Sequence, residues 1–237
     1  MAAKRVLVVQ NYDGEGLGQV GVALAEAGAD VQIFRPYRGD ALPATADGFD
    51  AMIVLGGVQN ALADDECPYF PEVLALLRDF EARDKAQLGI CLGSQLMARA
   101  FGGTNQIGGA TEFGWCEVSP TAEAAADPVI RAAGATTFPI FQWHDDTFSL
   151  PPRATRLAGS ATANNQAFRI GRATYGTQFH FEASRNLVAD WTSTHSEYMT
   201  RQKPGWVEQR HREQAEQLGE SADATGLALA RAWVAAI

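Results

Sequence analysis

The sequence predicts an α/β protein in which a mostly parallel central sheet is flanked by helices, with a small additional antiparallel sheet. In the first hundred residues, short apolar runs alternate with longer segments whose apolar residues have helical spacing. From residue 111 to residue 178, strand-like runs follow one another with turns between them. Alternating strands and helices favour parallel strands covered on both faces, whereas strands joined by turns favour antiparallel pairing.

The first half of the chain supplies the parallel part of this prediction. Apolar runs predict strands at residues 5–10, 31–34, 51–55 and 88–91. Helices are predicted between and after them, at residues 16–28, 71–83 and 94–101. The first helix repeats apolar residues with helical spacing, the second has a proline in its first turn and an apolar stripe, and the third stops at a pair of glycines.

The second half changes character twice. Strands are predicted at residues 114–119, 136–142, 154–160, 167–170 and 174–180, with a short helical piece at residues 129–133. Helices return from residue 185 to the end. Because no repeat or linker interrupts the chain, we expect one domain over residues 1–237, with residues 195–237 as a helical C-terminal extension. Its last helix has an apolar surface that we expect to pack against its own sheet, with a homodimer contact as the alternative.

Composition is that of a globular protein and excludes several function classes. The chain has 237 residues, 46% hydrophobic and 20% charged. With 19 Lys and Arg against 28 Asp and Glu, the net charge is −9, and no basic run occurs, so we expect no nucleic-acid binding. No apolar stretch approaches the roughly 20 residues that span a bilayer, and no secretory signal is evident at the start. We therefore expect a cytoplasmic protein without a membrane partner.

One of the three cysteines lies in a distinctive context. Residues 89–93 (GICLG) fall between a predicted strand and a predicted helix, with the G-x-nucleophile-x-G spacing of a nucleophile elbow. The turn is too tight for a Cβ at either glycine, and it exposes Cys91 at the carboxyl edge of the sheet. The amino end of the next helix favours the thiolate, and the N–H of Leu92 is placed to bind an oxyanion. Cys67 and Cys116 lack this context, and we expect them to be small buried residues.

A thiolate nucleophile needs a base, and the base needs an orienting group. His180 ends an apolar strand, and Glu182 lies two residues further on, on the same face of an extended chain. A carboxylate in that place accepts a hydrogen bond from the imidazole N–H and fixes its tautomer. A strand-end histidine with a chance acidic neighbour is the alternative, which the cysteine elbow disfavours. We therefore predict a catalytic triad of Cys91, His180 and Glu182.

A metal site is the other chemistry that the sequence suggests. His144, Asp145 and Asp146 have side chains that ligate divalent ions. Adjacent residues rarely converge on one ion, however, and no second ligand cluster accompanies them. We expect a polar loop near the substrate, with no metal and no other cofactor.

Four motifs, in this order along most of the chain, resemble those of the class I (triad-type) glutamine amidotransferases. They are residues 55–57 (LGG), 89–95 (GICLGSQ), 143–146 (WHDD) and 178–182 (QFHFE). Residues 149–152 (SLPP) and 165–168 (NQAF) are similar to stand-alone members that resemble the amidotransferase domain of GMP synthase. The resemblance implies the flavodoxin-like fold of that family.

The resemblance also implies roles for individual residues. Cys91 would attack the side-chain amide of glutamine, His180 would protonate the departing ammonia, and Glu182 would orient His180. The oxyanion hole would consist of backbone N–H groups of Gly57 and Leu92. The substrate-binding residues implied are Gly56, Gln95, Trp143, His144 and Asp145.

Two positions depart from the family pattern, which commonly has proline where Val58 and Phe181 stand. A looser turn at the oxyanion hole implies weak glutaminase activity without a partner. The favoured hypothesis is a glutamine-hydrolysing enzyme that passes ammonia to a separate synthetase subunit. The alternatives are an autonomous γ-glutamyl hydrolase or peptidase that acts on a conjugate, and a catalytically silent regulatory protein.

Overall fold

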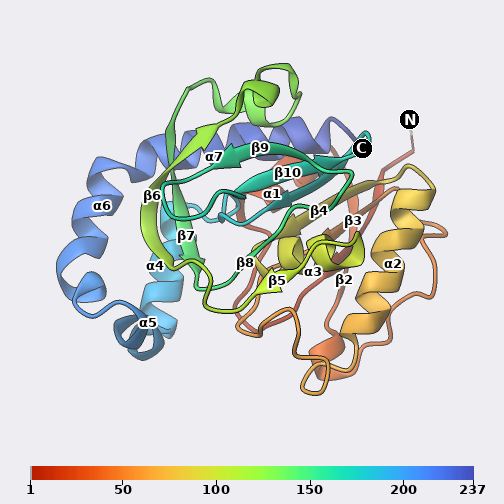
Figure 1. Ribbon diagram of the computed structural model, residues 1–237, viewed down its shortest axis with the longest axis horizontal. Coiled ribbons are helices and arrows are strands. Elements are labelled where there is room, and N and C mark those ends of the chain that lie inside the picture. Colours follow the sequence, from red (N-terminus) through yellow and green to blue (C-terminus); the bar gives the residue numbers. More distant parts are fainter. Residues whose placement is uncertain (1) are drawn as a thin grey trace.

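The computed structural model describes residues 2–237. A central sheet lies between helices on its two faces (Figure 1). Its nine strands have the order β2-β1-β3-β4-β11-β10-β9-β6-β7, and a separate antiparallel pair joins β5 to β8. The prediction of an α/β fold, with a mostly parallel central sheet and a small antiparallel one, is confirmed.

Five adjacent strands of the sheet run parallel. In sheet order they are β2 (Asp30–Phe34), β1 (Arg5–Val9), β3 (Ala51–Val54), β4 (Ala86–Ile90) and β11 (Thr174–Thr177). The residues of β3 and β4 are all buried, as the apolar runs predict for strands covered on both faces. Because parallel strands end at the same edge, the loops that follow β1, β3, β4 and β11 lie close together there.

Antiparallel strands continue the sheet beyond β11. They are β10 (Ala167–Ile170), β9 (Thr155–Gly159), β6 (Glu112–Pro120) and β7 (Phe138–His144). The small second sheet pairs β5 (Asn105–Gln106) with β8 (Thr147–Phe148). Strand β6 begins two residues before the predicted strand because Glu112, although charged, is buried and pairs in register with His144.

Two hydrophobic cores lie on opposite faces of the sheet. One contains residues of α1 (Gly18–Glu26), α4 (Arg185–Thr194), α5 (Ser196–Gln202) and α7 (Gly219–Val234). The other contains residues of α2 (Phe70–Ala82) and α3 (Leu92–Ala100). A π-helical turn at Trp206–Arg210 precedes α6 (His211–Gln217), which leads into α7.

The C-terminal helix α7 packs against the sheet of its own chain, as expected. Trp233 is fully buried, and its indole N–H donates to the carbonyl of Gln87 in β4 over 3.2 Å. A Cβ at Gly226 would come within 2.3 Å of the Phe181 carbonyl oxygen, so α7 lies directly against the segment that follows β11. The homodimer contact, the single-domain division and the C-terminal extension from residue 195 stay predictions.

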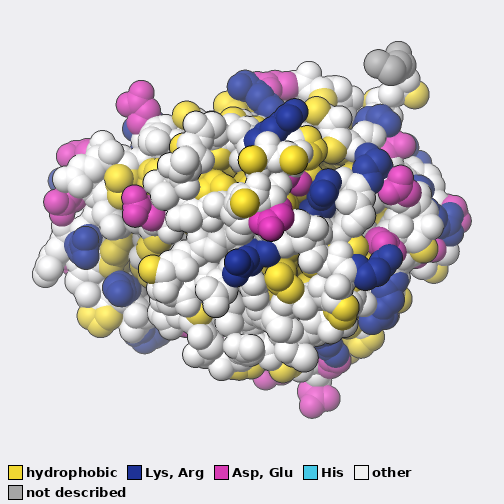
Figure 2. All heavy atoms as spheres, turned by 45° about the horizontal axis from the view of Figure 1, so that its top comes forward, with side chains coloured by type: hydrophobic (Ala, Val, Ile, Leu, Met, Phe, Trp, Pro, Cys, Tyr) yellow, Lys and Arg dark blue, Asp and Glu magenta, His cyan; other side chains and the backbone are white. Residues whose placement is uncertain are grey.

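The surface mixes charges of both signs. On the face drawn in Figure 2, basic and acidic side chains are interspersed among uncharged ones. Within residues 2–237, none of the helices combines the length and the apolar character needed to cross a membrane.

Candidate active site

Cys91 occupies a strained turn between β4 and α3. Its φ of 50° and ψ of −110° are rarely adopted by a residue with a side chain. A Cβ at Gly93 would lie 1.9 Å from the Val54 carbonyl oxygen, and one at Gly89 would lie 2.6 Å from the Gly93 carbonyl oxygen. Both glycines are therefore required by close backbone approach, as the G-x-C-x-G pattern predicts.

Strand pairing carries His180 to the same edge of the sheet as Cys91. Strand β11 lies parallel to β4 with Thr177 opposite Ile90, and the Cys91 N–H donates to the Thr177 carbonyl over 2.8 Å. The strand predicted at residues 174–180 ends at Thr177, because the chain then leaves the sheet. The His180 N–H donates to the carbonyl of Phe141 in β7 over 2.9 Å, which fixes the backbone there.

His180 and Glu182 form a buried pair. The His180 Nδ1 lies 2.6 Å from Glu182 Oε1, and the two residues are 3% and 1% exposed. Burial acts to lower the His180 pKa, but the Glu182 carboxylate and the Cys91 sulfur, by charge and hydrogen bonding, raise that pKa well above its ordinary value. The arrangement therefore favours an imidazolium next to the sulfur.

An unpredicted residue, Gln178, connects the cysteine to Gln95. The Gln178 Nε2 group donates to the Cys91 sulfur over 3.6 Å, and its Oε1 accepts from Gln95 Nε2 over 3.1 Å. The Cys91 thiol donates to the Trp143 carbonyl over 3.7 Å. Gln178 lies inside the QFHFE motif, but nothing in the sequence distinguishes it from any other amide side chain at the end of a strand, so no role was predicted for it.

The Gly56-Gly57 turn lies beside the first residue of α3. A Cβ at Gly57 would come within 2.8 Å of Leu92 Cδ2, so the backbone of the turn approaches that residue closely. Buried Asn11, which sequence reasoning missed, donates from Nδ2 to the carbonyl of Leu55 over 2.8 Å and anchors the start of the turn. Val58, where the family commonly has proline, is 52% exposed.

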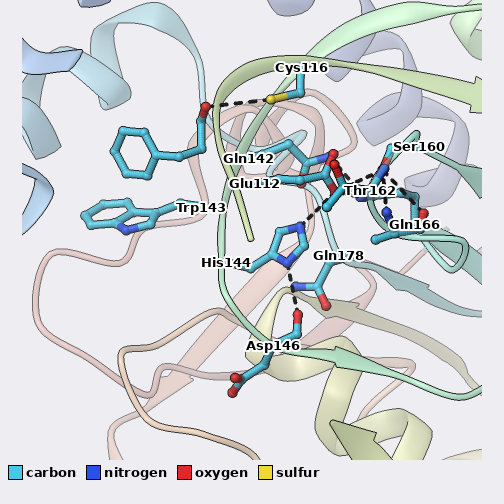
Figure 3. A network of polar contacts seen from close by, with 12 residues as sticks. Glu112, Cys116, Gln142, Trp143, His144, Asp146, Ser160, Thr162, Gln166 and Gln178 are labelled. Carbon is cyan, nitrogen blue, oxygen red and sulfur yellow. Dashed lines mark hydrogen bonds and ion pairs between the residues drawn. The ribbon is translucent and has the colours of Figure 1, made fainter. Parts of the chain in front are cut away.

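A buried polar network holds the end of β7, which carries Trp143 and His144, and the loop that follows it (Figure 3). His144 is 5% exposed, with its Nε2 3.3 Å from Glu112 Oε2 and its Nδ1 2.9 Å from the Asp146 carbonyl oxygen. Glu112 in turn accepts a hydrogen bond from Gln166, which accepts one from Gln142. Both ring nitrogens of His144 thus face other groups of the protein, and the ring fixes the end of β7 with Trp143 and the loop after it with Asp145.

A cavity of about 660 Å³ opens over the cysteine. The structure brings most of the predicted site residues to its lining, namely Gly57, Cys91, Leu92, Gln95, Trp143, His144, Asp145 and His180. Glu182 lies behind His180 and does not line the cavity. Gly56 lies below the lining, where a Cβ would be 3.3 Å from His180 Cε1.

Glu15, in the loop after β1, is a second carboxylate beside His180 that the sequence did not indicate. Ligand atoms of Glu15, His180 and Glu182 lie within 4.8 Å of one another. Burial, aided by the nearby Glu182 and opposed by His180, raises the pKa of Glu15 to about 7. Three such side chains could ligate a cation, but His180 Nδ1 is already engaged by Glu182, and the absence of a metal stays a prediction.

The fold and this constellation define the class of protein, and sequence comparison agrees. The sequence model of the family "Glutamine amidotransferase class-I" matches residues 18–188. The chain belongs to the class I glutamine amidotransferase family.

Individual relatives and solved structures are similar over most of the chain. The glutamine amidotransferase-like protein YfeJ of Salmonella typhimurium is 33% identical over 166 residues, which are 69% of each protein. One subunit of the glutamine-hydrolysing GMP synthase of Natronomonas pharaonis is 30% identical over 78% of this chain and 92% of its own length. The crystal structure of a glutamine amidotransferase from Thermotoga maritima superposes with a TM-score of 0.87 at 26% identity, covering 99% of this chain and 97% of that one.

Proposed function

We propose that the chain is a cysteine-dependent amidohydrolase that cleaves the γ-glutamyl amide of glutamine through a thioester on Cys91. The observation that carries the proposal is the strained Cys91 turn at the floor of the cavity, beside a His180–Glu182 pair held at 2.6 Å. Membership of the amidotransferase family, together with relatives named as glutamine-hydrolysing, supports glutamine as the substrate.

In the first half of the reaction, the Cys91 thiol passes its proton to His180, and the resulting thiolate attacks the side-chain carbonyl carbon of glutamine, so that a carbon–sulfur bond forms. The oxygen becomes an oxyanion, which the N–H groups of Gly57 and Leu92 stabilise. His180 gives its proton to the nitrogen, the carbon–nitrogen bond breaks, and ammonia departs.

In the second half, water adds to the thioester carbonyl and His180 takes a proton from it. The carbon–sulfur bond breaks, glutamate leaves, and the thiol is restored by that proton. Glu182 accepts the Nδ1–H hydrogen bond throughout, so it fixes the ring and stabilises the imidazolium. The raised His180 pKa suits this cycle because the protonated ring is the form that donates to the leaving nitrogen.

Substrate binding falls to residues around the same cavity. We propose that Gln95 contacts the glutamyl part, while Trp143 and Asp145 line the site around the amide end, where the Trp143 carbonyl lies 3.7 Å from the Cys91 sulfur. Gly56 and His144 shape the turn and the loop beneath the site. Gln178 is a positioning residue, since it holds both Gln95 and the sulfur.

The fate of the ammonia is a further part of the proposal. We propose that its acceptor is a separate synthetase, bound by this chain in the manner of a two-subunit enzyme. Similarity to proteins that are themselves named as subunits of a glutamine-hydrolysing GMP synthase supports this part. A cytoplasmic location of the enzyme belongs to the same proposal.

The test is glutamine hydrolysis by matched cysteine variants. We expect wild-type protein to release ammonia and glutamate, and Cys91→Ser to lose at least about a thousandfold in kcat/KM, because a serine hydroxyl here lacks the thiolate's nucleophilicity. Cys116→Ser, outside the cavity, is the control and is expected to keep wild-type turnover. Retained turnover in Cys91→Ser would contradict the assignment, and a wild type inactive on every γ-glutamyl compound would favour the silent regulatory protein.

The cavity volume favours one second candidate, an autonomous hydrolase of γ-glutamyl conjugates. A volume of about 660 Å³ falls in the range of roughly 300–1,000 Å³ typical of sites for ligands well above the size of an amino acid. Glutamine alone leaves much of that space free.

A further inference from the structure

Aromatic side chains line the cavity on one side of His180. They come from the loop after β1, from the end of β7, from helices α4 and α5 and from the residue between those helices, and we call them the aromatic wall: Tyr12, Trp143, Trp191, His195 and Tyr198. The wall starts at the imidazole itself, since the Trp191 ring meets the His180 ring edge to face with centroids 5.5 Å apart.

Ring contacts make the wall continuous. Trp143 lies 5.8 Å from Trp191, 6.4 Å from His195 and 6.0 Å from Tyr198 between ring centroids, and His195 lies 5.7 Å from Tyr12. The Trp191 indole N–H donates to the Gly14 carbonyl over 3.1 Å, which ties the wall to the loop that carries Glu15. Aromatic faces therefore extend from the general acid into the cavity.

Glu15 adds a polar group next to the start of the wall. Its Oε2 atom is buried and, among the described residues, has no hydrogen-bond partner, although Glu15 lines the cavity. A buried acceptor without a partner is costly unless a ligand supplies the hydrogen bond. The side chain is thus placed to accept an N–H from a group bound beside His180.

The position of His180 identifies which part of a substrate meets these groups. A general acid protonates the leaving nitrogen, so that nitrogen must lie within hydrogen-bond reach of the imidazole. Whatever substituent the nitrogen carries then extends along the surface that begins at His180. The leaving nitrogen of glutamine carries no substituent, so glutamine has no group that would contact the aromatic wall.

The charges of the lining restrict that substituent further. Glu15, Asp145 and Asp146 line the cavity against a single Lys or Arg side chain among the described residues, Arg201. Burial and the Asp145 charge raise the pKa of Tyr198, whereas Arg201, whose guanidinium lies 5.9 Å from the centre of the Tyr198 ring, acts to lower it. Since the acidic side chains outnumber this one guanidinium, they disfavour a carboxylate on the leaving group, whereas an amine that is protonated on departure is attracted by the acidic groups and the ring faces.

We propose that Glu15 and the aromatic wall form a leaving-group subsite for γ-glutamyl derivatives of arylalkyl amines, in which an alkyl chain joins the ring to the nitrogen, that lack a carboxylate. The inference rests on the proposed function and uses the same steps. Cys91 displaces the amine, His180 protonates the amine nitrogen as the carbon–nitrogen bond breaks, and water releases glutamate from the thioester.

The test compares four substrates that share the glutamyl half: glutamine, γ-glutamylethylamide, γ-glutamylphenethylamide and γ-glutamylphenylalanine. We expect kcat/KM for the phenethylamide to exceed that for the ethylamide and that for γ-glutamylphenylalanine by about tenfold or more, the scale of one good aromatic contact. Tyr198→Ala should reduce the phenethylamide-to-ethylamide ratio to about threefold or less, and Tyr198→Phe should keep it. Glu15→Gln should raise the rate on γ-glutamylphenylalanine relative to the phenethylamide.

Tyr37→Ala is the matched control, because it removes a tyrosine that does not line the cavity, and it should leave the ratio at the wild-type value. Equal kcat/KM for the two amides while glutamine is hydrolysed would overturn the subsite and leave the proposed function standing. If none of the four substrates is hydrolysed and Cys91 does not react with a glutamine analogue, both the subsite and the proposed function would be overturned. A ratio that falls equally in Tyr198→Phe and Tyr198→Ala would overturn the assignment to the aromatic ring.

Discussion

At the scale of single residues, the site places two carboxylates, those of Glu182 and Glu15, around the imidazole of His180. His180 and Glu182 were predicted from their spacing alone, because residues two apart on an extended chain share a face. Glu15, Asn11 and Gln178 could not be predicted in this way. Each acts through a contact with a residue far away in the sequence, and neither its type nor its neighbours mark it.

Glu15 provides a pH-dependent prediction. Its pKa, about 7 in the folded protein, lies above the value of 4.5 for a free side chain, chiefly because of burial. The unfolded chain therefore loses this proton first, and the free energy of unfolding falls as pH rises from about 4.5 to about 7. Glutamine does not titrate, so the free energy of unfolding of Glu15→Gln should not fall in this way. Between pH 4.5 and pH 8, we expect it to rise by roughly 1–3 kcal/mol relative to that of wild type, after allowance for partial exposure.

Urea unfolding of both proteins at pH 4.5, 6 and 8 measures this difference. Glu66→Gln, at an exposed glutamate, is the control for removing a negative charge. Parallel pH dependences for wild type and Glu15→Gln would contradict the prediction.

At the scale of elements, the turn between β4 and α3 is the part that the sequence predicted best. Two glycines around a cysteine, after an apolar run and before a helical one, already required a tight strand-to-helix turn. Ends of elements were harder to predict when a charge was buried or a strand left the sheet. Strand β6 begins at Glu112 because His144 and Gln166 contact its buried carboxylate. Strand β11 ends at Thr177 because the chain turns away there, and the His180 N–H then donates to the Phe141 carbonyl in β7.

The strain at this turn predicts an unusual order of stability. At φ 50° and ψ −110°, a residue with a Cβ is strained and glycine is not. We expect Cys91→Gly to be more stable than Cys91→Ala by about 1–2 kcal/mol, although glycine is ordinarily the less stable of the two near a helix. Denaturant unfolding checks the order, and an alanine variant at least as stable as the glycine variant would contradict the strain. Both variants lack the sulfur, so the difference in their free energies of unfolding reports the backbone strain at residue 91.

At the scale of the whole molecule, topology brings the site together. The strand order could not be predicted from local patterns, because β11, a late strand in the chain, inserts between β4 and the antiparallel strands. That insertion places the ends of β4 and β11 side by side and so joins Cys91 to His180. The helices after residue 185 then close the cavity with Trp191, His195 and Tyr198, which their sequence did not indicate.

The central claim is that Cys91, activated beside His180, attacks a γ-glutamyl carbonyl. Intact-mass analysis after treatment with a diazoketone analogue of glutamine tests it most directly, because only an activated thiolate that can bind the glutamyl half is trapped. The account predicts one adduct per chain, mapped to Cys91, and none in Cys91→Ala. An adduct on Cys67 or Cys116 instead, or no adduct on folded wild-type protein, would contradict it.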